Sequence, residues 1–253
     1  MVDIDSISKQ AIADVSQVEA AFEDLSLYNQ TLGFTHMRTV GDVARYTDTN
    51  DILEIGFFTG AVSLALARLR YDVTASDIPF VANDNALRAF LEKESITVVP
   101  WDLSDQTAPF AAKSFDLIVF TEVIEHLPFN CIPLLREFHR ILRPGGRVYC
   151  ATPNLGYVKT RLKLALGRDI GNPVSHLIAG LTPGTGVSVG LHWREHTKQS
   201  LIDLFEAAGF TCESHRYISM DPVESVFPKN VLKSALFKMS PAMLPGQVGV
   251  FRA

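Results

Sequence analysis

The chain alternates short, almost continuously apolar runs with longer segments in which apolar residues recur every three or four positions. The apolar runs predict buried parallel strands, and the three-to-four-residue period predicts amphipathic helices. With helices between them, strands are predicted at 52–55, 71–77, 96–101, 115–120 and 147–152. A strand–helix alternation of this kind, with no internal repeat, predicts an open and mostly parallel sheet with helices on both faces.

The pattern also divides the chain. Residues 1–50 are largely helical in pattern, and we interpret them as an N-terminal helical cap on a main domain at 51–253. A helix at 200–208 ends at a glycine and leads into a sixth strand through Tyr217. A hydrophobic segment, 222–246, is interpreted as a helical insertion, and residues 247–252 form a short closing strand.

Composition and charge narrow the class of protein. The 253 residues are 47% hydrophobic, which suits a sizeable core, and their net charge is −5, with no long Lys/Arg cluster, so a nucleic-acid partner is not favoured. Cys131, Cys150 and Cys212 lie far apart without metal-ligand spacing and indicate reduced thiols. No secretory signal pattern and no run of about 18 apolar residues is present, so we expect a cytoplasmic protein without an integral membrane segment.

The turn after the first strand carries the first candidate chemistry. Glu54-x-Gly56-x-x-x-Gly60 joins a buried strand to an Ala/Leu-rich helix, and this is where a nucleotide-like ligand approaches the backbone in doubly wound folds. The spacing is not the dinucleotide fingerprint. It resembles the first motif of class I S-adenosylmethionine-dependent methyltransferases, in which an acid precedes a Gly-x-Gly-x-Gly turn. The middle glycine of that pattern is Phe58, whose side chain must point away from the cofactor or partly fill its site.

The next two strands end in acids. Asp77 ends the second strand about twenty residues past the turn, where a carboxylate can accept hydrogen bonds from both ribose hydroxyls; a helix-cap or turn role before Pro79 is the alternative. Asp102 follows the third strand. The family resemblance places an acid there against the adenine amino group, and Leu103 beside it could add a backbone amide and an apolar contact.

The fourth strand ends in a polar cluster. The run from Ser114 to Leu127 resembles the fourth-strand motif of small-molecule methyltransferases, including the ubiquinone-biosynthesis type, with its Glu-His-Leu ending. That resemblance puts Thr121 and Glu122 near the methionine end of the cofactor. His126 is a candidate general base because of its ordinary pKa, with a local structural role as the alternative.

Residues 153–192 are interpreted as a lid or wall of the acceptor pocket, beginning with Asn154 and containing a basic amphipathic helix from Tyr157 to Leu166. The run His192-Trp-Arg194-Glu-His196-Thr resembles a segment that precedes the last large helix of glycan, lipid and natural-product methyltransferases. The resemblance implies that His192 and Arg194 face the acceptor; the alternative is that they lock the lid to the sheet edge. The candidate acceptor-binding residues are Asn154, Arg194 and His196, and His192 is a second catalytic candidate. A metal site is not expected, because the two histidines precede regular structure.

The motifs occur in family order over residues 50–220 and in the last strand, and the joint Leu142-Arg-Pro-Gly-Gly-Arg-Val148 is typical of the family. The resemblance implies a seven-stranded Rossmann-like methyltransferase sheet with an antiparallel C-terminal strand. It also implies S-adenosylmethionine as cofactor, S-adenosylhomocysteine as product, and O- or N-methylation of a small-molecule, sugar or lipid-type acceptor. Two alternatives stay open: a binding protein of this fold without catalysis, which Phe58 favours, and an NAD- or nucleotide-sugar-binding enzyme. A homodimer also stays open.

Overall fold

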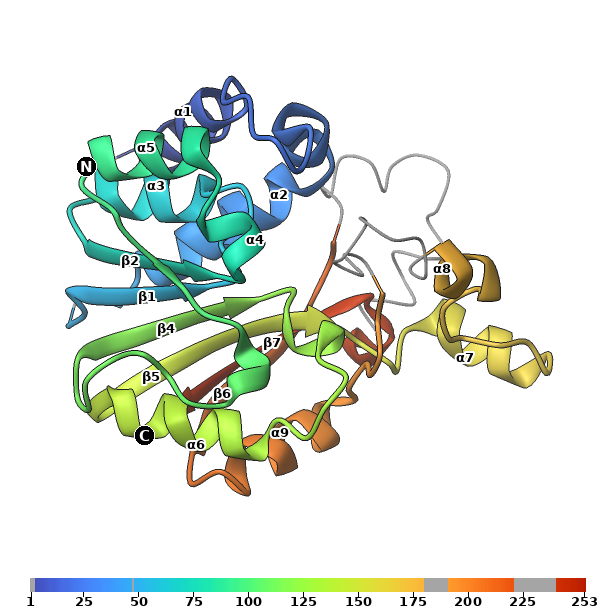
Figure 1. Ribbon diagram of the computed structural model, residues 1–253. Helices are drawn as coiled ribbons and strands as arrows, with labels where there is room; N and C mark the ends of the chain where they lie inside the picture. Colours follow the sequence, from blue (N-terminus) through green and yellow to red (C-terminus); the bar gives the residue numbers. More distant parts are fainter. Residues whose placement is uncertain (1–2, 47, 180–190, 221–239) are drawn as a thin grey trace.

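A single seven-stranded sheet organises the computed structural model, which describes residues 3–46, 48–179, 191–220 and 240–253 (Figure 1). The strand order is β3-β2-β1-β4-β5-β7-β6. Strands β1 to β5 pair in parallel, and β7 lies antiparallel between β5 and β6. This confirms the predicted fold class. The strands are β1 (Asp51–Ile55), β2 (Asp72–Asp77), β3 (Thr97–Pro100), β4 (Phe115–Thr121), β5 (Leu142–Pro153), β6 (Thr211–Ile218) and β7 (Gly246–Arg252).

Helices cover both faces of the sheet (Figure 1). One hydrophobic core joins the strands to the first five helices, and a second core joins the opposite face to α6 and α9. The alternation of side chains along β1 explains the division, because Ile52 packs in the first core and Leu53 in the second. The helices are α1 (Ile4–Val15), α2 (Leu25–Val43), α3 (Ala61–Arg68), α4 (Pro79–Ala82), α5 (Asn85–Lys93), α6 (Ile132–Ile141), α7 (Val158–Ala165), α8 (Val174–Ala179) and α9 (Lys198–Glu206).

The N-terminal helices differ in extent from the sequence prediction. The sequence predicted largely helical structure over residues 1–50, but α1 ends at Val15 and α2 begins only at Leu25. Asp24 sets the new start because its side chain accepts a hydrogen bond from the Leu27 N–H (3.1 Å). The longer α2 buries polar residues, so its apolar period is weak in the sequence. Both helices contact α3, while the division of the chain at residue 50 stays a prediction.

The segment after β5 leaves the body of the molecule. Helices α7 and α8 extend away from the sheet (Figure 1), and α7 buries none of its residues. This agrees with the predicted helix from Tyr157. Most of the predicted insertion 222–246 lies outside the described residues, and its described end forms a 3-10 turn, η4 (Pro241–Met243). None of the described helices is long and apolar enough to cross a membrane.

The amino-terminal edge of the parallel strands is held by ion pairs. Arg143 Nη1 lies 2.6 Å from Asp51 Oδ2 and 2.7 Å from Asp116 Oδ1. The other oxygen of Asp116 accepts from the Asn50 and Asp51 amides, each at 3.0 Å. Burial acts to raise the pKa of Asp116, but the bonds from Arg143 and the amides outweigh it and hold the pKa below its usual value. Asp116 therefore begins its strand far from the ligand edge.

Candidate functional site

The turn between β1 and α3 brings backbone close to the fourth strand. Gly56 has φ +77°, and its N–H donates to the Ser76 carbonyl (2.8 Å). A Cβ added at Gly56 would lie 2.3 Å from Cγ2 of Val123, so both the conformation and the space require glycine. Gly60, also at φ +77°, precedes the first residue of α3 and packs beside Leu91 instead of lining the cavity described below.

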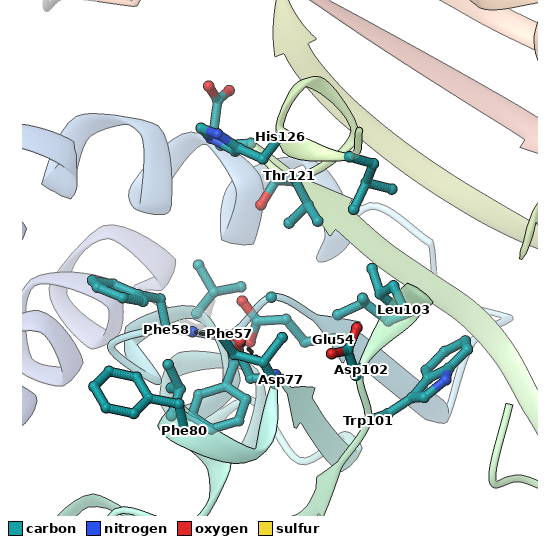
Figure 2. Close-up of a pocket in the computed structure, with 18 of the residues that line it drawn as sticks. Glu54, Phe57, Phe58, Asp77, Phe80, Trp101, Asp102, Leu103, Thr121 and His126 are labelled. Carbon is teal, nitrogen blue, oxygen red and sulfur yellow. Dashed lines mark hydrogen bonds between the residues drawn. The ribbon is translucent and has the colours of Figure 1, made fainter. Parts of the chain in front are cut away.

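Phe58 occupies a left-handed backbone conformation, φ +40°, that the family pattern assigns to glycine. Its N–H donates to Asp77 Oδ2 (2.9 Å). Its ring packs against Tyr28 and Phe22, with centroids 4.5 and 5.3 Å away, and in Figure 2 it points away from Glu54 and Asp77. The ring thus packs beneath the N-terminal helices, and Phe58 is also among the residues that line the cavity described below.

Two carboxyl groups stand at the ends of β1 and β2. Glu54 is buried, and the Ser63 hydroxyl donates to its Oε2. Burial raises the pKa of Glu54 to about 8, opposed by Ser63 and reinforced by the charge of Asp77. Burial likewise raises the pKa of Asp77 to about 6, although the Phe58 and Ile78 amides donate to it. Both groups are therefore poised to gain from a cationic or hydrogen-bond-donating ligand.

Asp102 and Leu103 follow β3, as predicted, on the 3-10 turn η1 (Leu103–Asp105). Asp102 is exposed and caps the turn by accepting from the Ser104 N–H (2.9 Å). One carboxylate oxygen of Asp102 has no hydrogen-bond partner among the described residues, so it can still accept from a ligand.

These residues line one cavity of about 610 Å³ at the carboxyl ends of the parallel strands. Figure 2 shows Glu54, Asp77 and Asp102 across from Thr121 and His126. Of the predicted cofactor residues, all but Gly60 line it. The wall also contains aromatic residues and a histidine that the sequence analysis did not select: Tyr28, His36, Phe80, Trp101, Phe129 and Trp193.

The cap contributes two of these unselected residues from α2. Burial raises the pKa of Tyr28 to about 12, and the acids Glu122 and Asp77 reinforce the shift. Burial lowers the pKa of His36 to about 4, with the charge of Arg38 as a second cause, and its Nδ1 has no hydrogen-bond partner among the described residues. His36 is therefore a neutral imidazole, able to donate or accept one hydrogen bond in the cavity.

The end of β4 holds two further carboxyl groups. Glu122 has φ +55° and lines the cavity, and Glu125 lies on the 3-10 turn η2 (Ile124–His126), fully buried. Thr152 Oγ1 donates to Glu125 Oε2 (2.9 Å). The Oε1 atoms of both glutamates are buried and have no hydrogen-bond partner among the described residues. Burial raises the pKa of both, and the neighbouring Glu125 raises that of Glu122 further.

The two predicted catalytic histidines meet beside these acids. The His126 and His192 rings lie edge to face, with centroids 4.9 Å apart. His126 lines the cavity, and its Nδ1–H donates to the Leu191 carbonyl (2.8 Å). His192 donates from Nδ1 to Glu195 Oε1 (3.0 Å), which raises the pKa of His192 against the effect of burial. The structure brings together two residues that are distant in the sequence.

Three residues were predicted to contact the acceptor: Asn154, Arg194 and His196. None of them lines the cavity. The Asn154 amide donates to the Ala242 and Leu244 carbonyls (3.0 and 2.8 Å) and accepts from the Gly156 N–H. His196 is buried, with its carbonyl accepting from Gln247 Nε2 (2.6 Å). Arg194 is exposed and is not part of the cavity wall. Asn154 and His196 thus join the lid to the sheet, which corrects their assignment to the acceptor.

The order β3-β2-β1-β4-β5-β7-β6, with β7 antiparallel and a ligand cavity at the strand ends, defines a Rossmann-like methyltransferase fold. A family model described as "Methyltransferase domain" matches residues 41–215. The chain belongs to this family, the class I S-adenosylmethionine-dependent methyltransferases.

Curated relatives and a solved structure agree. The chain is 25% identical to a ubiquinone biosynthesis O-methyltransferase of Ruegeria pomeroyi, over 68% of this chain and 64% of the relative. It is also 25% identical to a ubiquinone/menaquinone biosynthesis C-methyltransferase of Desulfotalea psychrophila, over 63% and 65%. The chain thus spans just under two thirds of each relative. A SAM-dependent methyltransferase structure from Archaeoglobus fulgidus shares the fold, with a TM-score of 0.59 at 14% identity over 91% of this chain and all of that one.

Proposed function

We propose that this protein transfers a methyl group from S-adenosylmethionine to a small-molecule acceptor through oxygen or nitrogen. The observation that carries the proposal is the cavity at the carboxyl edge, where Glu54, Asp77 and Asp102 face Thr121 and His126 (Figure 2). In open α/β sheets ligands bind at this edge. The cavity is also large enough for a cofactor and a small acceptor together.

The residues on the β1–β3 side suit the cofactor. Glu54 is a buried carboxyl group with Ser63 as its hydrogen-bond donor, so a ligand ammonium would compensate its charge. Asp77 would accept from the ribose hydroxyls and Asp102 from the adenine amino group, with Leu103 against the ring. The cofactor supplies a methyl group on a positively charged sulfur, which is already activated for displacement. The protein's part is then to orient the two reactants and exclude water.

The other side of the cavity suits the acceptor. Phe129 and Trp193 offer aromatic surface, which favours a planar or largely apolar molecule over a highly polar one such as a free sugar. His126 lies at this end. Since its Nδ1 carries the proton donated to Leu191, its Nε2 is free to take a proton from an acceptor hydroxyl or amine. Methyltransferases of ubiquinone biosynthesis among the relatives agree with an aromatic acceptor.

Calorimetric titration of ligand-free protein with S-adenosylhomocysteine, S-adenosylmethionine and NAD tests the cofactor. We expect micromolar binding of the first two, no heat from NAD, and loss of binding in Asp77→Ala. Transfer of a labelled methyl group to a panel of phenols, amines and sugars then tests the acceptor. Binding of NAD alone, or of none of the three, would refute the proposal, and cofactor binding with no transfer to any acceptor would favour the binding-protein alternative.

A further inference from the structure

Three potential metal ligands converge at the end of β4, where one of them, His126, lines the cavity. Glu125, His126 and His192 each offer one ligand atom, and these atoms lie within 4.8 Å of one another. Glu125 and His126 come from the end of β4, and His192 comes from the segment that follows the lid. Two imidazoles and a carboxylate are a common ligand set for divalent transition metals. This is the one such group among the described residues.

A hydrogen bond from Nδ1 fixes the tautomer of each histidine and leaves Nε2 available to a metal. The Nδ1 atoms of His126 and His192 donate to the Leu191 carbonyl and to the Glu195 carboxylate. In the neutral rings Nε2 is therefore the atom with a lone pair, and it makes no hydrogen bond to the described residues. Metal-binding histidines are almost always oriented by a carbonyl or carboxylate in this way.

The buried acids supply a second, independent reason for a cation. Glu125 has no exposed surface, and its Oε1 lies 3.8 Å from Nε2 of His126 without accepting a hydrogen bond from any described residue. The Oε1 of Glu122, adjacent to it, is likewise buried and unpartnered among those residues. Burying two neighbouring carboxyl groups is costly unless a positive charge compensates them. A divalent cation bound between the histidines and Glu125 would provide that charge.

We propose that Glu125, His126 and His192 bind one divalent transition-metal cation, with Glu122 beside it. Three protein ligands leave coordination positions open toward the cavity, as in catalytic metal sites. The sequence analysis predicted no metal because it considered only the pair His192 and His196. The structure separates that pair, since His196 is buried against Gln247, and replaces it with residues from the end of β4.

The role of the cation rests on the proposed function, whereas its binding does not. With the cation bound, Nε2 of His126 is a ligand and not a base, so this route replaces the direct proton transfer to His126. An acceptor hydroxyl in an open position would have its pKa lowered and would release its proton to solvent. Its oxygen then supplies the electron pair that forms the bond to the methyl carbon. The carbon–sulfur bond breaks, its electron pair stays on sulfur, and S-adenosylhomocysteine leaves. The charge of the cation is unchanged throughout.

Calorimetric titration of tag-free, chelator-treated protein with MnCl2, CoCl2 and ZnCl2, without cofactor, tests the binding. We expect one site per chain. His126→Gln and His192→Gln should each weaken binding by about 100-fold, and Glu195→Gln, which removes the orienting carboxylate, by about tenfold. His139→Gln, on α6 beside Phe210, is the matched control and should bind as the wild type does.

Thermal unfolding of every variant verifies that it is folded. No 1:1 binding of any of the three cations to wild-type protein, or equal binding by both ligand variants and the control, would overturn the proposal. Titration with S-adenosylhomocysteine in the same metal-free buffer keeps the two proposals separate. If S-adenosylhomocysteine binds and the metals do not, only the metal-site proposal is refuted. If the metals bind and S-adenosylhomocysteine does not, only the cofactor assignment is refuted.

Discussion

The pKa values of acidic residues are shifted in opposite directions at the two edges of the sheet. At the amino-terminal edge Asp116 pairs with Arg143, and its pKa is lowered. At the carboxyl edge Glu54, Asp77 and Glu122 form no ion pair with an arginine of the described residues. Burial raises their pKa values, although the charge of Arg38 partly opposes the shift of Glu122. Acids at the first edge have their cation within the chain and stabilise the fold. Acids at the second lack one, which is typical of a site whose charge balance is completed by a ligand.

The largest effect should follow from Asp77→Asn. An ionised carboxylate that accepts from ribose hydroxyls contributes about 1.5–3 kcal/mol, so S-adenosylhomocysteine should bind about 10- to 150-fold more weakly. Wild-type affinity should also fall as the pH drops through about 6, because Asp77 then takes up a proton. Calorimetry between pH 5 and 8 measures both. Asp102→Asn, at an exposed site, is the control and should lose less than tenfold; equal affinity of Asp77→Asn and wild type would contradict the ribose role.

Glu54→Gln should change the pH dependence of stability. The pKa of Glu54 is raised from 4.5 to about 8, so the folded state holds a proton that the unfolded state has released. Wild-type unfolding free energy should therefore fall as pH rises from about 5 to 9, and the glutamine variant should lose about 1–3 kcal/mol less over that range. Urea unfolding at pH 6 and 9 measures this. Glu19→Gln, at an exposed position, should follow the wild type, and parallel curves for all three proteins would contradict the assignment.

Asp116→Asn probes the opposite edge. The variant loses the charge that pairs with Arg143, and since these side chains are partly exposed we expect a loss of about 1–2 kcal/mol at pH 7. The Asp116 pKa is lowered in the fold, so its contribution is present above about pH 4 and is lost as the pH falls further. The difference from wild type should thus be large at pH 7 and should shrink steadily in urea unfolding as the pH is lowered below 4. Cofactor affinity should not change; a weakened affinity would contradict the separation of the two edges.

Phe58→Gly should have the smallest effect. The substitution restores the family's glycine and relieves a φ of +40°, but removes the ring contacts with Phe22 and Tyr28. These contributions oppose each other, so we expect stability within about 1 kcal/mol of wild type. Affinity for S-adenosylhomocysteine should change less than about threefold, because the residue 58 N–H still donates to Asp77. A gain of more than tenfold would show that the ring obstructs the cofactor.

The sequence predicted the parts of the molecule that depend on local pattern. Strand ends of a parallel sheet share one edge, so Glu54, Asp77 and Asp102 could be placed together from their positions after apolar runs. Residues that reach the cavity from other elements could not be found this way. Tyr28 and His36 reach the cavity from α2, whose buried polar residues conceal its period.

The proximity of His192 to Glu125 and His126 was also missed by the sequence analysis, for a different reason. It depends on how the segment after the lid is tied to η2, where the Trp193 and Arg194 amides donate to the Glu125 carbonyl (2.7 and 3.2 Å). Such contacts between distant segments leave no periodic signal in the sequence. The only available sign was negative: a cluster of His and Glu at 192–196 without a regular element to align it.

The antiparallel β7 has a consequence for the time course of folding during synthesis. Strand β6 pairs only with β7, which in turn separates it from β5. Arg252, the last residue of β7, is synthesised 34 residues after Ile218, the last residue of β6. At a synthesis rate of about 5–20 residues per second, β6 waits roughly 2–7 s for its partner. During that interval the nascent chain presents two unpaired strand edges, on β5 and β6, and chaperone binding would be most useful there.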